Sequence, residues 1–167
     1  MKLVQLTNNL FAKVDDDDFD ELSSYKWRAQ FDKKLNGYYA NRRFQVEGKR
    51  VCLSMHRQVM KTPKGIVCDH VDHDTLNNQK SNLRNCTHAQ NLRNRKGATR
   101  VSKTRVVGVA PHGAGYLAYV TSPDDGKQIG LGTFATIEEA RLARSEAEKK
   151  YYGEFAFKES ENGNVSV

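Results

Sequence analysis

The chain has 167 residues, enough for one ordinary domain or for two or three small ones. Its formal net charge of +7 and its isoelectric point near 9.3 favour a polyanionic partner. A signal peptide and a membrane-spanning apolar run are both missing, so we expect a soluble, intracellular, cytoplasmic protein without membrane contact. The three cysteines, Cys52, Cys68 and Cys86, lack C-x-x-C spacing, which argues against disulfides and against structural zinc.

The first 64 residues are predicted to form a small β-rich segment. Met1–Thr7 and Phe11–Val14 have the pattern of two strands joined by a tight turn. The acidic run 15–18 follows and resembles a metal site at first sight. We interpret it as the acidic N-terminus of a short helix, where carboxylates cap free N–H groups and meet the positive end of the helix dipole.

The rest of this segment has an aromatic anchor and a basic strand. Trp27, the single tryptophan, is predicted to lie in the core of the small sheet. The run 38–44 is predicted to be a strand, and strand alternation places Arg42 and Arg43 on opposite faces. Both arginines are candidates for contact with backbone phosphates.

The centre of the chain has a strand, loop, strand and helix pattern. Ile66-Val67-Cys68 indicates a buried strand that ends at Asp69-His70, and the Asn-rich run 72–80 indicates a loop. Residues 82–86 form the second predicted strand. A helix should follow at residue 87, because Thr87 with Gln90 makes a capping box.

Four polar side chains are distributed over these pieces. Asp69 and His70 lie at the end of the first strand, Asn82 lies before the second, and Asn91 lies in the first turns of the helix. Carboxylate and amide oxygens suit Mg²⁺ or Mn²⁺, and histidine is the usual general base near neutral pH. The pattern therefore predicts a hydrolytic metal site.

This arrangement resembles the HNH (His-Me finger, ββα-metal) nuclease motif, and more closely the HNH homing endonucleases of phages. The resemblance implies that His70 is the general base and that Asp69 and Asn91 hold one Mg²⁺ or Mn²⁺ per active site. It implies that Asn82 bonds across the loop. His56, in a Met-His-Arg run found before the finger in related phage nucleases, either lies beside the site or packs in the core. The implied substrate is double-stranded DNA, cut to 5′-phosphate and 3′-hydroxyl ends.

A basic stretch begins at this site, because residues 75–123 contain no Asp or Glu. We place the finger at residues 65–96 and a linker at residues 97–105. The cations expected to contact DNA phosphates are Arg93, Arg95, Lys96, Arg100, Lys103 and Arg105.

Residues 106–158 are predicted to form a separate small module. Strands are expected at 106–110, 116–121 and 128–134, followed by a helix that a capping box of Thr136 and Glu139 opens. The tail 159–167 is polar and expected to fray.

This module resembles the plant ethylene-response-factor type of DNA-binding domain. The resemblance rests on Gly108-Val109, on alternating residues from Tyr116 to Val120, on Leu131-Gly132-Thr133-Phe134 and on Glu139-Ala140. It implies that one sheet face enters the major groove, although the arginines and tryptophans of that face are largely missing here. A small domain for protein contact is the alternative. The residues expected against the helix are Val109, Tyr116, Ala118, Val120, Ile129 and Leu131. Those expected to face DNA are His112, Leu117, Tyr119, Thr121, Gln128 and Gly130.

Together these patterns predict an α+β protein with a β-rich N-terminal segment, a ββα-metal finger, and a three-stranded antiparallel sheet packed on one helix. The predicted function is site-specific DNA cleavage of the homing type by one metal ion and a histidine base. Two alternatives remain, a DNA-binding regulator with an inactive finger and an HNH restriction or defence nuclease. A monomer would nick one strand, whereas a homodimer could cut both.

Overall fold

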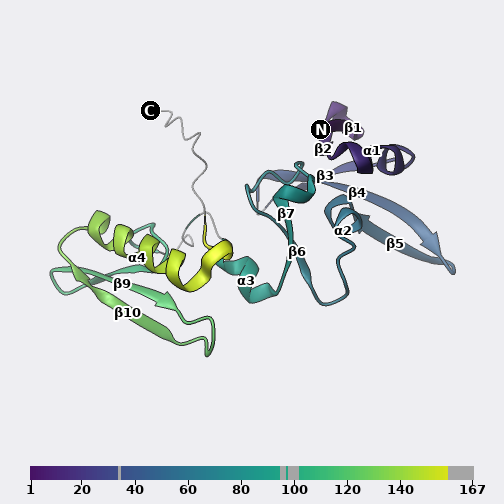
Figure 1. The fold of residues 1–167 in the computed structure, drawn as a ribbon. Coiled ribbons are helices and arrows are strands. Elements are labelled where there is room, and N and C mark those ends of the chain that lie inside the picture. Colours follow the sequence, from purple (N-terminus) through teal and green to yellow (C-terminus); the bar gives the residue numbers. More distant parts are fainter. Residues whose placement is uncertain (34, 95–96, 98–101, 158–167) are drawn as a thin grey trace. The chain divides into compact units, whose positions relative to one another are not determined.

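The computed structural model describes residues 1–33, 35–94, 97 and 102–157. The chain divides into two compact units, Met1–His88 and Ala89–Val167, which are described in turn. Both combine short antiparallel sheets with helices, and the predicted α+β class is confirmed (Figure 1).

The first unit opens with the predicted hairpin. Strands β1 (Lys2–Gln5) and β2 (Phe11–Val14) pair antiparallel. A short 3₁₀ turn joins them, and Asn8 and Asn9 adopt positive φ angles of 61° and 55° there. Asparagine tolerates this left-handed conformation better than most residues do, which explains the Asn-Asn pair at this point. Helix α1 (Asp16–Ser23) follows and contains three aspartates in its first turn.

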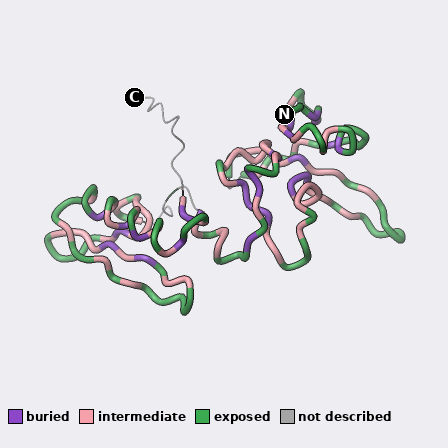
Figure 2. The backbone as a smooth tube through the Cα atoms, viewed as in Figure 1, coloured by how far each residue is buried: buried purple, intermediate pink, exposed green. Residues whose placement is uncertain are grey.

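A meander forms the next layer of the first unit. Strands β3 (Arg28–Asp32), β4 (Gly37–Val46) and β5 (Lys49–Ser54) are paired in that order, and helix α2 (Met55–Val59) follows directly. The unit's apolar core gathers residues from the hairpin, α1, the meander and α2, visible as buried segments in Figure 2. Trp27 is 3% exposed and its indole N–H donates to the Leu22 carbonyl at 2.8 Å, as the core-anchor prediction requires.

The finger has the predicted order of elements. Strand β6 (Val67–His70) pairs antiparallel with β7 (Leu83–Cys86), and helix α3 (His88–Arg93) begins two residues after β7 ends. A long loop and a 3₁₀ turn (Lys80–Asn82) connect the two strands. The first unit thus contains both strands of the finger and ends at His88, the first residue of α3, whose remaining residues belong to the second unit.

The second unit is a three-stranded sheet with one long helix. Its strands β8 (Val109–His112), β9 (Gly115–Thr121) and β10 (Gln128–Phe134) are ordered β10-β9-β8. Helix α4 (Ile137–Tyr152) begins with the predicted reciprocal capping box of Thr136 and Glu139. A 3₁₀ turn (Gly153–Phe155) follows. The residues expected on the helix side do pack there, in clusters that include Val109, Ala118, Val120 and the helix residues Ala140 and Ala147.

One strand of this sheet differs from the prediction. The first strand was expected at 106–110 and instead runs from Val109 through Pro111 to His112. Gly108 has a φ of +68°, and its carbonyl accepts the Tyr119 N–H at 2.8 Å, so the chain bends just before the strand. Proline ends most strands, but β8 is an edge strand, where a residue without an N–H is tolerated.

Among the described residues, none of the helices is long and apolar enough to cross a membrane.

Candidate active site

The finger strands place Asp69 beside a cation. In the β6–β7 register Asp69 lies opposite Arg84, and cross-strand neighbours on one face are close enough to form ion pairs. Both the Nε and the Nη2 groups of Arg84 donate to Asp69 Oδ2, at 3.0 and 2.8 Å. The side chains are only 12% and 10% exposed, so water screens this pair weakly.

His70 is buried at the end of β6, with 5% of its surface exposed. Burial lowers the pKa of His70, because the charged imidazolium loses its hydration; a hydrogen bond with Asn78 and the nearby Asp69 carboxylate act in the opposite direction. The imidazole is therefore neutral near neutral pH. A neutral imidazole is the form that can accept a proton as a general base.

Two further rings surround His70. The His56 ring lies 4.9 Å from the His70 ring with an interplanar angle of 72°, and the Tyr39 ring lies 5.9 Å from it. Burial lowers the pKa of His56 to about 3, and the neighbouring His70 and Arg57 act in the same direction. His56 is thus both a buried packing residue and a neighbour of His70. Tyr39 was not selected from the sequence as a neighbour of His70, because nothing but its place in an aromatic strand sets it apart there.

Asn82 closes the loop between the finger strands. Its side-chain oxygen accepts the Asp72 N–H at 3.0 Å, and its Nδ2 group donates to the Asn77 carbonyl at 2.9 Å. The Asn82 carbonyl also accepts the Val71 N–H at 2.9 Å. These hydrogen bonds cross the loop and hold Val71 and Asp72, the residues that directly follow His70.

Asn78 lies deep inside the loop, although sequence reasoning treated it as an ordinary loop residue. It is 1% exposed, and its interaction with His70 offsets part of the lowering of that histidine's pKa by burial. In a run that reads Asn-Asn-Gln, the pattern gives no signal to separate the buried asparagine from its half-buried neighbours. The structure adds Asn78 to the surroundings of His70.

The N-terminal segment supports the same loop. Lys13 in β2 exchanges backbone hydrogen bonds with Leu76 and Asn78, and its ammonium pairs with Asp74 at 3.0 Å. The acidic run does begin a helix, as predicted. Its first member, Asp15, however, makes no side-chain bond to that helix.

Asp15 binds the loop instead. Its carboxylate accepts a hydrogen bond from the Lys80 backbone N–H at 2.8 Å and another from the Gln79 side-chain Nε2 group at 3.0 Å. The Lys80 N–H bond is the main reason that the pKa of Asp15 lies below its ordinary value. The Lys80 ammonium pairs with Asp18 at 2.7 Å. Two of the four aspartates thus attach the loop to the N-terminal segment.

The two candidate arginines of β4 differ in their surroundings. The Arg42 guanidinium lies 3.9 Å from the Tyr25 ring centroid and donates to Gln58 at 3.0 Å. The Arg43 side chain is exposed. Arg43 is therefore the better placed of the two to reach a phosphate.

The remaining predicted site residues belong to the second unit, apart from three outside the described residues. Asn91 lies on α3 and is half-buried. Arg93 lies 5.0 Å from the Tyr152 ring centroid, whereas Lys103 and Arg105 are exposed. Arg95, Lys96 and Arg100 lie outside the described residues.

The sheet residues expected to face DNA lie on the face opposite α4. His112, Thr121 and Gln128 are exposed and Tyr119 is half-buried. Thr121 and Gln128 are cross-strand partners, and so are Tyr119 and Gly130. The structure thus assembles these residues into one surface.

A hard cation beside His70 would have Asp69 as its carboxylate ligand, since the two residues are adjacent in β6. Within the described ranges no group of three or more His, Cys, Asp and Glu side chains could hold a metal. A single carboxylate is a ligand that Mg²⁺ accepts, because this ion commonly takes its remaining ligands from water and substrate phosphates.

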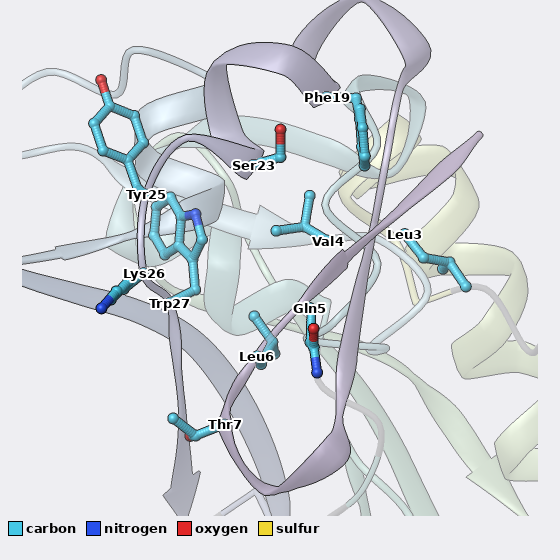
Figure 3. Close-up of a pocket in the computed structure, with 10 residues that line it drawn as sticks. All are labelled: Leu3, Val4, Gln5, Leu6, Thr7, Phe19, Ser23, Tyr25, Lys26 and Trp27. Carbon is cyan, nitrogen blue, oxygen red and sulfur yellow. The ribbon is translucent and has the colours of Figure 1, made fainter.

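A separate pocket of about 520 Å³ lies between β1, α1 and the chain from Ser23 to Trp27 (Figure 3). Apolar side chains such as Leu3, Phe19 and Trp27 line much of it. None of its lining residues is among the predicted site residues.

Comparison with known families bears directly on the finger. Residues 61–93 match the model of the HNH endonuclease family. The matched segment contains Asp69, His70, Asn82 and Asn91, and the match supports an HNH nuclease domain over this part of the chain. Neither the curated proteins nor the solved structures gave a match to the chain.

Proposed function

We propose that the protein is a site-specific, metal-dependent DNA endonuclease of the homing type. The observation that carries the proposal is that Asp69 and the buried His70 stand next to each other at the end of β6, inside the segment that matches the HNH family. A buried, neutral imidazole beside a carboxylate suits phosphodiester hydrolysis, because one group accepts a proton and the other favours a cation.

The proposed reaction assigns one role to each residue. His70 accepts a proton from a water molecule, and the oxygen of that water attacks phosphorus as the bond to the 3′ oxygen breaks. The products have 5′-phosphate and 3′-hydroxyl ends. Asp69 and Asn91 would hold one Mg²⁺ or Mn²⁺, which when bound supplies positive charge next to the leaving oxygen. Asn82 keeps the loop in place through its bonds to Asp72 and Asn77.

DNA binding is proposed to use both units. Arg43 and the exposed linker cations Lys103 and Arg105 suit phosphate contacts, which give affinity without sequence preference. The exposed sheet face that includes Thr121 and Gln128 suits contact with base edges. The net charge of +7 supports a polyanionic partner of this kind.

A plasmid assay tests the proposal. Supercoiled plasmid is incubated with wild-type protein in Mg²⁺, Mn²⁺ or EDTA, next to His70→Ala and to Lys64→Gln as an exposed-charge control. We expect nicked or linear DNA only with metal, cleavage by Lys64→Gln, and loss of cleavage in His70→Ala with DNA binding kept. Binding without cleavage by the wild-type protein would instead identify a regulator with an inactive finger. Cleavage with little sequence preference would favour a defence nuclease.

A further inference from the structure

The ion pair between Arg84 and Asp69 has a consequence for how a cation binds. Asp69 is the one carboxylate among the proposed ligands, and its Oδ2 atom already accepts two N–H groups from Arg84. The pair is nearly buried. Because opposite charges at this distance largely cancel, a divalent ion near Asp69 meets little net negative charge from these two residues.

The other carboxylates of the loop are used for other contacts. Asp72 accepts the Asp74 N–H and the Asn77 amide, and Asp74 accepts the Leu76 N–H and the Lys13 ammonium. These bonds hold the loop in its conformation. Lys13 neutralises Asp74, whereas the two donors to Asp72 are neutral and leave its charge in place. With Asp69 and Asp74 both paired with cations, the scissile phosphate is the main further source of negative charge for a cation at Asp69.

On the basis of the proposed function, we propose that Arg84 is a positioning residue that sets the affinity of Asp69 for the divalent ion. By neutralising Asp69 it makes ion binding weak in the free protein and strong only with a DNA phosphate in place. Its two hydrogen bonds to Oδ2 also fix the orientation of the carboxylate. Binding of metal and of DNA are then coupled, and each increases the affinity of the other by the same factor.

Equilibrium Mn²⁺ binding in the absence of DNA tests the electrostatic part. Removing the charge with Arg84→Gln should tighten Mn²⁺ binding about tenfold or more, because a cation near a divalent ion is lost from a weakly screened site. Arg84→Lys keeps the charge and should bind Mn²⁺ as the wild type does, although it loses the planar fork. Lys64→Gln removes an exposed charge from the same family-matched segment and should change nothing. Adding Asp69→Asn to Arg84→Gln should abolish the gain.

Damage to the fold would change Mn²⁺ affinity in the opposite direction. A variant that had merely lost structure would bind Mn²⁺ more weakly, so tighter binding separates the electrostatic role from a structural one. Folding of each variant is checked by circular dichroism and by Trp27 fluorescence. If folded Arg84→Gln binds Mn²⁺ no more tightly than the wild type, the proposal is wrong.

Coupling is measured without any change at Arg84, which keeps the test decisive if Arg84→Gln does not fold. In a His70→Ala background, which leaves DNA intact, duplex DNA should tighten Mn²⁺ binding about tenfold or more. Equal Mn²⁺ affinity with and without DNA would overturn the proposal. Failure of the proposed function has another signature, namely a wild-type protein that does not cut DNA with any metal.

Discussion

The bonds of Asn82 lead to a quantitative prediction about the finger loop. In Asn82→Ala, the Asp72 N–H and the Asn77 carbonyl both lose their partner, and the mutated side chain itself is 7% exposed. A net intramolecular hydrogen bond contributes about 0.5–1.5 kcal/mol, and a buried group left without a partner costs about 1–3 kcal/mol. Because Asp72 is exposed and water can replace part of the loss, we expect destabilisation by about 2–3 kcal/mol.

Urea unfolding followed by Trp27 fluorescence measures this loss, since the single tryptophan lies in the core of the same unit. Asn85→Ala is the matched control. The Asn85 side chain also makes two hydrogen bonds, to Thr62 and to the Met60 carbonyl, but at an exposed position. It should cost less than about 1 kcal/mol. An Asn82→Ala midpoint equal to that of the wild type, or less affected than that of Asn85→Ala, would refute the assigned role in the loop.

Three further predictions use other parts of the chain. His70→Ala should lower the cleavage rate by about 10²–10⁴, the usual effect of losing a positioned general base, with DNA affinity by gel shift changed no more than a few-fold. The lowered pKa of Asp15 means that its bonds to Lys80 and Gln79 stabilise the fold above the ordinary value of 3.8, and that this stabilisation is lost as pH falls through the lower folded-state pKa. Asp15→Asn should therefore be less stable than the wild type at pH 7, and the difference should shrink as pH falls below 3.8; a constant difference between their unfolding midpoints would contradict this. Replacing Lys103 and Arg105 with Ala should flatten the slope of log K against log salt by about one to two units, whereas Thr121→Ala with Gln128→Ala should change preference among DNA sequences at an unchanged slope.

Local patterns were sufficient to predict most elements of the fold. The Asn8-Asn9 turn, the capping box of Thr136 and Glu139, and the alternation from Tyr116 to Val120 each depend on neighbours in sequence, and each is present in the structure. The start of β8 was misplaced, because the bend at Gly108 is accompanied by a hydrogen bond from the N–H of Tyr119, a residue on another strand. Long-range contacts of that kind leave no periodic signal.

The same distinction applies to the site. Asp69, His70 and Asn82 could be selected from their residue types and order. A metal ligand requires a hard oxygen donor, a general base requires a group that accepts a proton near neutral pH, and a residue that bonds across a loop requires both a donor and an acceptor. Arg84 could not, because its contact with Asp69 depends on the β6–β7 register, and an arginine in a strand is ordinarily a surface residue. Tyr39 and Asn78 were missed for a related reason, since only the three-dimensional fold shows that they surround His70.

The acidic run shows how one segment can satisfy two structural requirements. Asp16, Asp17 and Asp18 meet the positive end of α1, which is the role that their position in sequence predicts. Asp15 and Asp18 also bind the backbone and ammonium of Lys80, the residue that opens the turn before β7. Because Asn82 lies in that same turn, the N-terminal segment helps to determine where the Asn82 bonds are made. The geometry around His70 therefore depends on contacts more than sixty residues apart in sequence. This dependence explains why the hairpin, α1 and the finger strands form one compact unit.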